Sequence, residues 1–352
     1  MKKVLVAMSG GVDSSVAAML LQEQGYDVEG ATLELLPNED NDSLSQASID
    51  AKAVASHLGI RHHVVFARDD FERYVIRPFA HEYICGRTPN PCVLCNRHIK
   101  FGRLFEEAMR TGFDYVATGH YAKIDKDSSG NYHLFRADSR KDQTYVLYSL
   151  GQKELSHVLF PLTDMEKDDL RSLARDRGLP AADKADSQDI CFVPQGSYSS
   201  VVERYENCTF GEGNFLSVNG EVLGKHRGYT HFTIGQRKGV GISSTAPLYV
   251  VGIHPAENAV ILGPESDLFR KEIYAGEVNF ISGQRISKPI SLEAKTRYQA
   301  PLASATVYPT DDEKMVRVVF DEPIRAMTPG QAVCFYQGTE LLGGGTILQD
   351  EQ

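Results

Sequence analysis

The chain has 352 residues, which is enough for two or three domains of ordinary size. Its formal net charge of −10 argues against indiscriminate binding of polyanions, and no apolar stretch approaches the ~20 residues that cross a bilayer. The apolar run after Met1 is too short for a signal-peptide core, so we expect a cytoplasmic protein with no membrane association. In a cytosolic chain of this length, six cysteines indicate catalysis, redox chemistry or metal binding rather than a disulfide framework.

Strand-like and helix-like segments alternate through roughly the first 120 residues. Short apolar runs predict strands, and apolar residues at helical spacing that end at a glycine predict helices. The predicted strands cover 4–8, 27–35, 62–67 and 115–120, and the predicted helices cover 12–24, 47–58, 69–84 and 97–110. This alternation is typical of a parallel sheet with helices on both faces, so we expect a Rossmann-like α/β domain.

Helical patterns continue to about residue 204, with a capping box at Thr163–Glu166 and a helix stop at Gly178. Beyond that point glycine and β-branched residues dominate, and Asn219-Gly220 predicts a hairpin. Later strands are predicted within 248–263 and at 290–298, 303–308, 315–320 and 332–336. We therefore expect a catalytic α/β domain at 1–204, a small mixed or β central domain at 205–271 and a C-terminal β-barrel at 272–352.

The strongest motif is the glycine-rich segment from Ala7 to Ser15, which follows a predicted strand and opens a predicted helix. Its glycines let the backbone wrap around phosphate oxygens, and the helix N-terminus offers free N–H groups and a positive dipole end. Asp13 would repel a polyanion, and a Mg²⁺ ion bridging its carboxylate to phosphate resolves this conflict. A Walker P-loop is excluded because the Gly-Lys-Ser/Thr ending is missing.

Two cysteines lie in surroundings that favour reactivity. Cys95 follows the rigid, proline-containing segment 88–94, and we expect it just before a helix and near Arg97, His98 and Lys100, all of which would lower its pKa. Cys191 ends the polar segment 186–190. Cys92-x-x-Cys95 also has the spacing of half a zinc site, but no second pair follows it, which disfavours structural zinc. The remaining cysteines are expected to be inert, namely Cys85, Cys208 and Cys334.

Six motifs occur in one order along the chain and carry a resemblance to a known family. They are Ser-Gly-Gly-Val-Asp-Ser, Thr-Pro-Asn-Pro-x-x-x-Cys-Asn, Ala-Thr-Gly-His-Tyr, Lys-Asp-Gln-Thr-Tyr, Ile-Cys-Phe and Thr-Ile-Gly-Gln-Arg. From residue 4 to about residue 348 the chain resembles the bacterial tRNA-specific 2-thiouridylases, or tRNA-uridine 2-sulfurtransferases, of the PP-loop ATP pyrophosphatase superfamily. Members of that family adenylate the wobble uridine of tRNAs for Lys, Glu and Gln at C2 and replace the oxygen with sulfur.

The resemblance assigns roles to individual residues. Cys95 corresponds to the catalytic nucleophile and Cys191 to the cysteine that carries a persulfide, supplied by a cysteine desulfurase or a sulfur-relay protein. The positions implied for ATP are Ala7, Met8, Ser9, Gly10, Gly11, Val12, Asp13, Ser14, Leu33 and Gly119. The positions implied for tRNA are Asn90, Pro91, Cys92, His120, Lys141, Asp142, Gln143, Arg297, Tyr298 and Gln331.

One position departs from the family pattern and leaves the sulfur chemistry open. Many members have Asp, a candidate acid or base, where this chain has Cys92. One hypothesis keeps the Cys191 persulfide, which either attacks C2 itself or loses sulfide when Cys95 attacks it. A second hypothesis places a 4Fe–4S cluster on Cys92, Cys95 and Cys191, with one open iron that binds sulfide.

Two other functions are compatible with a PP-loop fold, namely amide synthesis and non-catalytic binding. An amide-forming PP-loop synthetase would need an ammonia source, and a non-catalytic nucleotide- or RNA-binding protein would not need Asp13 and both cysteines.

Between Val222 and Gly252 the chain carries several cations and no acidic residue, which predicts either a tRNA-phosphate contact or a solvated hairpin face. These cations are Lys225, Arg227, Arg237 and Lys238, called the basic stripe below.

Overall fold

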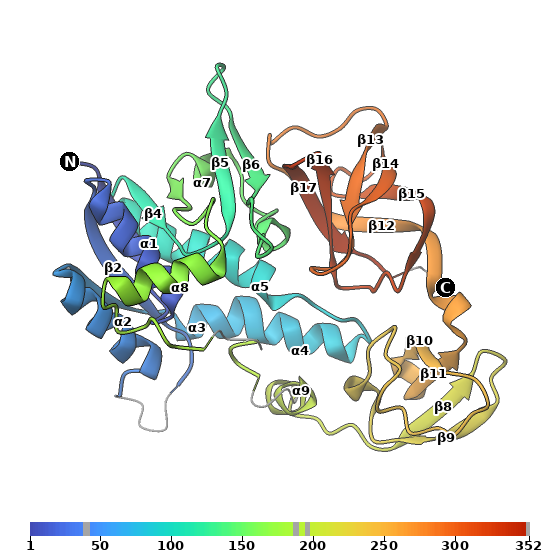
Figure 1. Cartoon of the computed structure of the whole chain (residues 1–352). Helices are drawn as coiled ribbons and strands as arrows, with labels where there is room; N and C mark the ends of the chain where they lie inside the picture. The colour runs from blue at the N-terminus through green and yellow to red at the C-terminus, as the bar shows by residue number, and fades with distance from the viewer. Residues whose placement is uncertain (38–42, 186–189, 194–197, 350–352) are drawn as a thin grey trace.

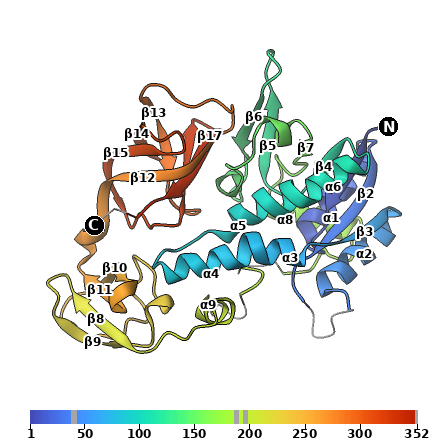
Figure 2. The same cartoon turned by 180° about the vertical axis from the view of Figure 1, so that it is seen from behind.

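The computed structural model describes residues 1–37, 43–185, 190–193 and 198–349, so residues 186–189 of the polar segment before Cys191 lie outside it. The chain forms an α/β part coloured blue to green, a small β part coloured yellow to light orange, and a barrel coloured orange to red (Figure 1). In Figure 1 and in the reverse view of Figure 2, helix α4 (Arg77–Ile84) points from the α/β part toward the small β part. Among the described residues, no helix is long and apolar enough to cross a membrane.

The α/β part is built on a five-stranded parallel sheet, as the alternating pattern predicts. The strand order is β3-β2-β1-β4-β7. Helices α1 and α2 pack on one face of this sheet, and the segment that ends in α6 packs on the other. The elements are β1 (Lys3–Ala7), α1 (Val12–Glu23), β2 (Asp27–Glu34), α2 (Gln46–Leu58), β3 (Arg61–Phe66), α6 (Phe105–Arg110), β4 (Tyr115–Ala117) and β7 (Val158–Leu159).

Two helical segments lie between β3 and β4, and each contains a π-helical stretch; the first confirms the predicted helix at 69–84, whereas the second begins six residues earlier than the predicted residue 97. The first runs through α3 (Arg68–Phe71), η1 (Glu72–Ile76) and α4, and the second through α5 (Pro91–Leu94), η2 (Cys95–Leu104) and α6. The prediction of a loop up to residue 96 was wrong. Asn90 caps the second helix by accepting a hydrogen bond from the N–H of Cys92 at 3.2 Å, and Pro91 is pre-set for the first turn. Cys95 therefore lies inside the helix rather than before it.

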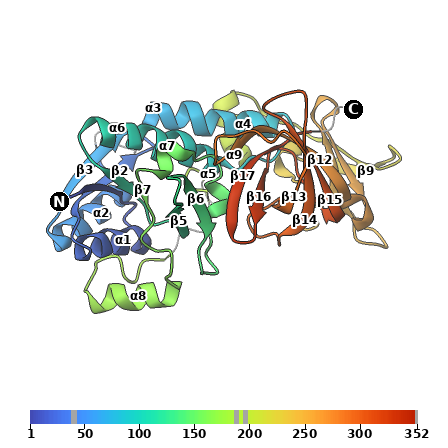
Figure 3. The same ribbon diagram turned by 90° about the horizontal axis from the view of Figure 1, so that it is seen from above.

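The segment between β4 and the small β part differs from the predicted run of helices. It contains the hairpin β5 (Ala122–Lys126) and β6 (Tyr132–Arg136), then η3 (Thr144–Val146), α7 (Gln152–Leu155), α8 (Lys167–Asp176) and α9 (Tyr198–Glu206). The capping box at Thr163 was also wrong, because the Thr163 hydroxyl donates to the carbonyls of Ala122 and Phe160, and α8 begins only at Lys167. The stop at Gly178 is confirmed, with φ of 64° just after α8. Figure 3 shows α8 beside α1.

The small β part is a four-stranded sheet in the order β10-β11-β8-β9. The predicted hairpin at Asn219-Gly220 is confirmed, since it joins two antiparallel strands. The elements are β8 (Gly213–Ser217), β9 (Val222–His226), η5 (Tyr229–His231), β10 (Tyr249–His254), η6 (Pro255–Glu257), β11 (Ala259–Gly263) and η7 (Glu265–Leu268).

The C-terminal part is a barrel, as predicted, and it shares a sheet with the α/β part. Antiparallel strands in the order β12-β15-β14-β13-β16-β17 close through pairing of β12 with β17, and β17 also pairs with β6 of the hairpin. The strands are β12 (Phe269–Phe280), β13 (Ile290–Lys295), β14 (Ala303–Pro309), β15 (Val316–Arg325), β16 (Ala332–Gln337) and β17 (Glu340–Ile347). This continuous sheet fixes the barrel beside the α/β part.

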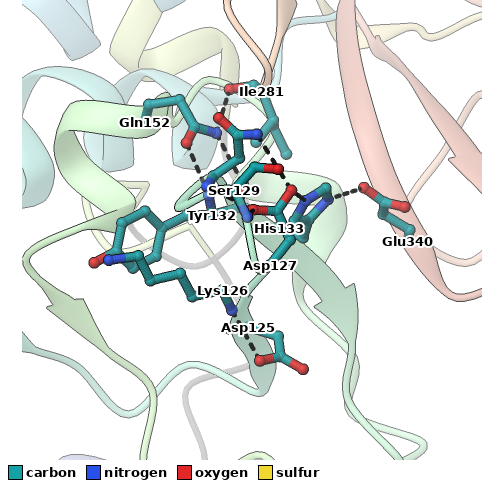
Figure 4. A network of polar contacts seen from close by, with 10 residues as sticks. Asp125, Lys126, Asp127, Ser129, Tyr132, His133, Gln152, Ile281 and Glu340 are labelled. Carbon is teal, nitrogen blue, oxygen red and sulfur yellow. Dashed lines mark hydrogen bonds and ion pairs between the residues drawn. The ribbon is translucent and has the colours of Figure 1, made fainter.

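Side chains reinforce this junction, as Figure 4 shows. His133 of β6 contacts Glu340 of β17 through Nδ1 at 2.6 Å, and its Nε2 lies 3.3 Å from Asp127 in the hairpin turn. Gln152 donates to the carbonyl oxygens of Tyr132 and of Ile281, which follows β12. The hydrogen bond with Glu340 is the largest cause that raises the pKa of His133 above its ordinary value.

This junction should weaken at alkaline pH. The raised pKa means that protonated His133 stabilises the folded state fully below about pH 6.5, and that this contribution is lost as the pH rises through the folded-state pKa. We expect His133→Ala to lower the Tm more at pH 5.5 than at pH 8.5, with a loss of at most about 1 kcal/mol for this partly exposed pair. Scanning calorimetry of wild type, His133→Ala and Glu340→Gln at both pH values measures this, and equal Tm losses at both values would contradict it.

Candidate active site

The glycine-rich loop between β1 and α1 has a shape that suits phosphate oxygens. Gly11 precedes α1 without any side-chain cap, so the first turn presents its N–H groups outward. Gly10 has φ of 70°, and a Cβ there would lie 2.8 Å from the carbonyl oxygen of Ala47. The Ser14 hydroxyl accepts from the N–H of Ser9 at 3.2 Å and donates to the carbonyl of Gly11 at 3.1 Å. These contacts hold the loop in one backbone conformation.

Two further residues implied for the nucleotide lie at or beside this loop. Gly119 follows β4 and contacts the loop so closely that a Cβ would lie 2.9 Å from the backbone of Asp13 and Ser14. Leu33 is partly buried near the carboxyl end of β2, the strand that pairs with β1, and Met8 donates its N–H to Ala31 of β2. Both positions lie at the carboxyl edge of the parallel sheet, where doubly wound folds bind ligands.

Asp13 lies against a lysine that sequence reasoning missed. Its Oδ1 accepts from Lys167 Nζ at 2.6 Å and from the Tyr121 hydroxyl at 2.8 Å. Gln143 fixes Tyr121 through two hydrogen bonds: its side-chain oxygen accepts from the N–H of Tyr121, and its own N–H donates to the Tyr121 carbonyl. A second lysine, Lys184, donates to the carbonyl of Gly10 at 3.2 Å. The loop thus holds a carboxylate whose charge is already compensated, and no local signal in the sequence connects Lys167 with Asp13.

The structure brings the three thiols of the predicted sulfur site near one cation. Cys92 and Cys191 are exposed and Cys95 is partly buried, packed against the apolar cluster that includes Phe192. The thiols influence one another electrostatically, and the charge of Lys100 acts on all three. The prediction of a lowered pKa at Cys95 was wrong, because burial is the largest cause and raises the pKa of this thiol to about 12, with only Lys100 opposing it.

The residues of the sulfur site do not form a site for a single metal ion. Within the described residues, no group of three His, Cys, Asp or Glu side chains could hold such an ion, so no zinc site is found among them. The 4Fe–4S cluster on Cys92, Cys95 and Cys191 stays a prediction. Of the remaining cysteines, Cys334 is fully buried, Cys208 is partly buried, and Cys85 lies 3.6 Å from the imidazole of His81.

Segment 88–92 packs against the barrel, and some residues implied for tRNA lie at this contact. Gln331 donates to the carbonyl of Thr88 at 2.9 Å, and Thr88 donates its N–H to Pro329. Tyr298 is 39 % exposed, and the Cys92 thiol is close enough to influence its pKa electrostatically. An accessible aromatic ring near the thiols is suited to stacking on an unstacked base.

Several other residues implied for tRNA make contacts within the protein. Arg297 donates through Nη2 to the carbonyl of Ile234 at 3.0 Å and to the Thr328 hydroxyl at 2.5 Å, so it joins the barrel to the small β part. Asp142 is buried and accepts from the Thr144 hydroxyl. His120 is buried as well, whereas Lys141 and all four residues of the basic stripe are exposed.

Fold and loop geometry together define an α/β nucleotide-binding protein of the PP-loop class, with a PRC-barrel and a C-terminal β-barrel attached. Residues 2–195 match the family described as the tRNA methyl transferase HUP domain, residues 200–264 its PRC-barrel domain, and residues 270–347 the aminomethyltransferase beta-barrel domain. The chain is 46% identical over 98% of its length to the tRNA-specific 2-thiouridylase MnmA of Acetivibrio thermocellus, and covers 99% of that protein. It is 49% identical to the MnmA of Carboxydothermus hydrogenoformans over 98% of this chain and 97% of the relative. The chain belongs to the family of tRNA-specific 2-thiouridylases.

Solved structures resemble the chain only in part. A 4-thiouridine synthetase–RNA complex with bound ATP has a TM-score of 0.36 at 18% identity, and covers 58% of this chain and 50% of its own. The U34-tRNA thiolase NcsA of Methanococcus maripaludis, with its 4Fe–4S cluster, has a TM-score of 0.34 at 20% identity, and covers 58% and 66%. At these scores neither likeness supports a conclusion about chemistry.

Proposed function

We propose that the protein is an ATP-dependent tRNA-uridine 2-sulfurtransferase that thiolates C2 of the wobble uridine in tRNAs of the Lys, Glu and Gln type. The observation that carries this proposal is the combination of two sites in one chain of this family, a phosphate loop with Asp13 and a pair of cysteines, Cys95 and Cys191, near one lysine. Neither the amide-forming synthetases nor a purely binding protein would need both.

The first half-reaction is adenylation of the base. The C2 oxygen of uracil attacks the α-phosphorus of ATP, the bond to the β-phosphate breaks, and pyrophosphate leaves. Residues Ala7–Ser14 cradle the phosphates with backbone N–H groups, while Leu33 and Gly119 border the nucleoside. A Mg²⁺ ion, held by Asp13 and phosphate oxygens, would neutralise charge on the departing pyrophosphate, with Lys167 released from Asp13 to the same anion.

The second half-reaction replaces the activated oxygen with sulfur. A desulfurase or a relay protein supplies a persulfide on Cys191, and AMP leaves with the former C2 oxygen when sulfur attacks C2. In one route the terminal persulfide sulfur attacks C2, and Cys95 then attacks the Cys191 sulfur, which frees the thiolated base. In the other route Cys95 first attacks the Cys191 sulfur of the persulfide, which releases sulfide, and this sulfide then attacks C2. Both routes end in a Cys95–Cys191 disulfide that an external thiol must reduce.

tRNA would lie across all three parts of the chain. Asn90, Pro91 and Cys92 would border the target base, and Tyr298 and Gln331 would approach it from the barrel. Lys141 and the basic stripe are exposed and available to phosphates, whereas Asp142, Gln143 and Arg297 would act mainly by holding the surface in shape. The domain boundaries near 205 and 272 stay predictions.

ATP–pyrophosphate exchange in the presence of tRNA tests the proposal. The protein should incorporate labelled pyrophosphate into ATP only when a tRNA with an unmodified wobble uridine is present. Exchange that needs ammonia or glutamine in place of tRNA would instead identify an amide-forming synthetase, and no exchange with any tRNA would indicate a binding protein.

The basic stripe should contribute to tRNA affinity through phosphate contacts. We expect the double charge reversal Arg237→Glu and Lys238→Glu to weaken binding and to reduce the slope of log K against log salt by about 0.7–0.9 for each lost contact. Filter binding between 50 and 200 mM salt measures the slope, with Lys288→Glu on the exposed barrel surface as the matched control. A slope equal to that of wild type would show that the stripe faces solvent in the complex.

A further inference from the structure

The π-helical geometry of η2 aligns Cys95 with Lys100. In a π-helix the hydrogen bonds run from residue i to i+5, so residues five apart lie on nearly the same face. In an α-helix, residues five apart would point about 140° apart. Position 102 in the same stretch is a glycine, and a Cβ added there would lie 3.0 Å from the carbonyl oxygen of Arg97. Cys95 and Lys100 are the first and sixth residues of this stretch.

Lys100 is held in place by a neutral imidazole. Its Nζ lies 3.5 Å from His120 Nε2, and His120 Nδ1 lies 2.6 Å from the Thr118 hydroxyl. A lysine ammonium has only donors, so Nε2 accepts and Nδ1 carries the proton that it donates to Thr118. Burial and the charge of Lys100 hold the pKa of His120 well below its ordinary value, which keeps the ring neutral. The positive charge therefore stays on Lys100.

Lys100 has no carboxylate partner in the parts of the chain that the structure describes, 1–37, 43–185, 190–193 and 198–349. Its charge instead acts on the thiols of Cys92, Cys95 and Cys191, where it opposes the effect of burial. A cation that is fixed by a neutral partner and shares a helix face with the proposed nucleophile is suited to the stabilisation of anionic sulfur.

We propose that Lys100 is a catalytic residue of the sulfur-transfer step, whose ammonium contacts the thiolate of Cys95 and the anionic persulfide of Cys191. The role of Lys100 in turnover rests on the proposed function, whereas the effect of its charge on Cys95 requires neither tRNA nor ATP.

The experiment compares Lys100→Gln, Lys100→Arg and the matched control Arg97→Gln, a neighbouring exposed cation on the same helix. Iodoacetamide labelling of Cys95, quantified by peptide mass spectrometry across pH 7–11, reports its thiolate. We expect the labelling rate at pH 8 to fall about tenfold or more in Lys100→Gln, because a higher pKa of Cys95 leaves less thiolate at this pH, and to fall far less in Lys100→Arg and Arg97→Gln. The measurement uses the full chain and needs no substrate.

Two kinetic readouts complete the test. tRNA-dependent ATP–pyrophosphate exchange should stay within about twofold of wild type in Lys100→Gln, while single-turnover thiolation from a preloaded persulfide should fall about 10²-fold. An unchanged pH profile of Cys95 labelling would overturn the assignment, as would equal losses of exchange and thiolation. If wild type shows no exchange with tRNA, the proposed function fails, but the labelling result still decides the charge role of Lys100.

Discussion

Asp13→Ala should fold normally and lose tRNA-dependent adenylation by about 10²–10³-fold. The carboxylate accepts hydrogen bonds from Lys167 and Tyr121, and it is the only acidic residue in segment 7–15 that could share a Mg²⁺ ion with phosphate. Without it, the ion would lose its protein ligand and Lys167 would lose the partner that positions it. AMP formation in the presence of tRNA measures the effect.

Asp13→Asn provides the matched control for this prediction. The amide keeps the size of the side chain and an oxygen acceptor for Lys167 and Tyr121, but not the charge that binds the metal. It should therefore keep the wild-type Tm and yet lose adenylation as Asp13→Ala does. Normal AMP formation by Asp13→Ala would contradict the role given to the carboxylate.

Cys95→Ser and Cys191→Ser should each abolish thiolation while leaving tRNA-dependent ATP–pyrophosphate exchange intact. A serine hydroxyl cannot carry a persulfide or form the disulfide that completes either sulfur-transfer route. The two variants should differ in one respect, since only Cys191→Ser should fail to accept labelled sulfur from a desulfurase. Cys334→Ser, at a buried thiol outside the site, serves as the control.

Labelled sulfur retained on the protein, measured after gel filtration without reductant, separates the two roles. Equal loading of Cys95→Ser and Cys191→Ser would contradict the assignment of the persulfide to Cys191. Loss of tRNA-dependent ATP–pyrophosphate exchange in either variant would show that the cysteine also shapes the nucleotide site.

Local sequence patterns predicted those parts of the fold that local interactions determine. The strand, glycine loop and helix at 3–23 and the hairpin at Asn219-Gly220 each depend on residues that are neighbours in the sequence. The hairpin β5–β6 was missed because its stability comes from pairing with β17, about 200 residues later, and such pairing leaves no periodic signal of its own. The helix start at Pro91 did have a local signal, the Asn-Pro cap, which the proline-rich loop interpretation overlooked.

The site shows the same division between local and distant causes. The phosphate loop and the reactive cysteines could be named from the sequence, but their electrostatic surroundings could not. Lys167 reaches Asp13 from 154 residues away, and the burial that raises the pKa of Cys95 arises from packing against Phe192 and its neighbours. The alignment of Lys100 with Cys95 depends on a π-helical turn, which helical periodicity does not reveal.

The central claim is that this protein places sulfur on C2 of the wobble uridine at the expense of ATP. Purified protein, ATP, Mg²⁺, cysteine, a cysteine desulfurase and an unmodified tRNA for Glu should yield 2-thiouridine at position 34, with one AMP formed for each sulfur transferred. Liquid chromatography with mass spectrometry of the digested tRNA measures both the nucleoside and its position. Sulfur at another position, such as 4-thiouridine, or 2-thiouridine formed without ATP, would contradict the account.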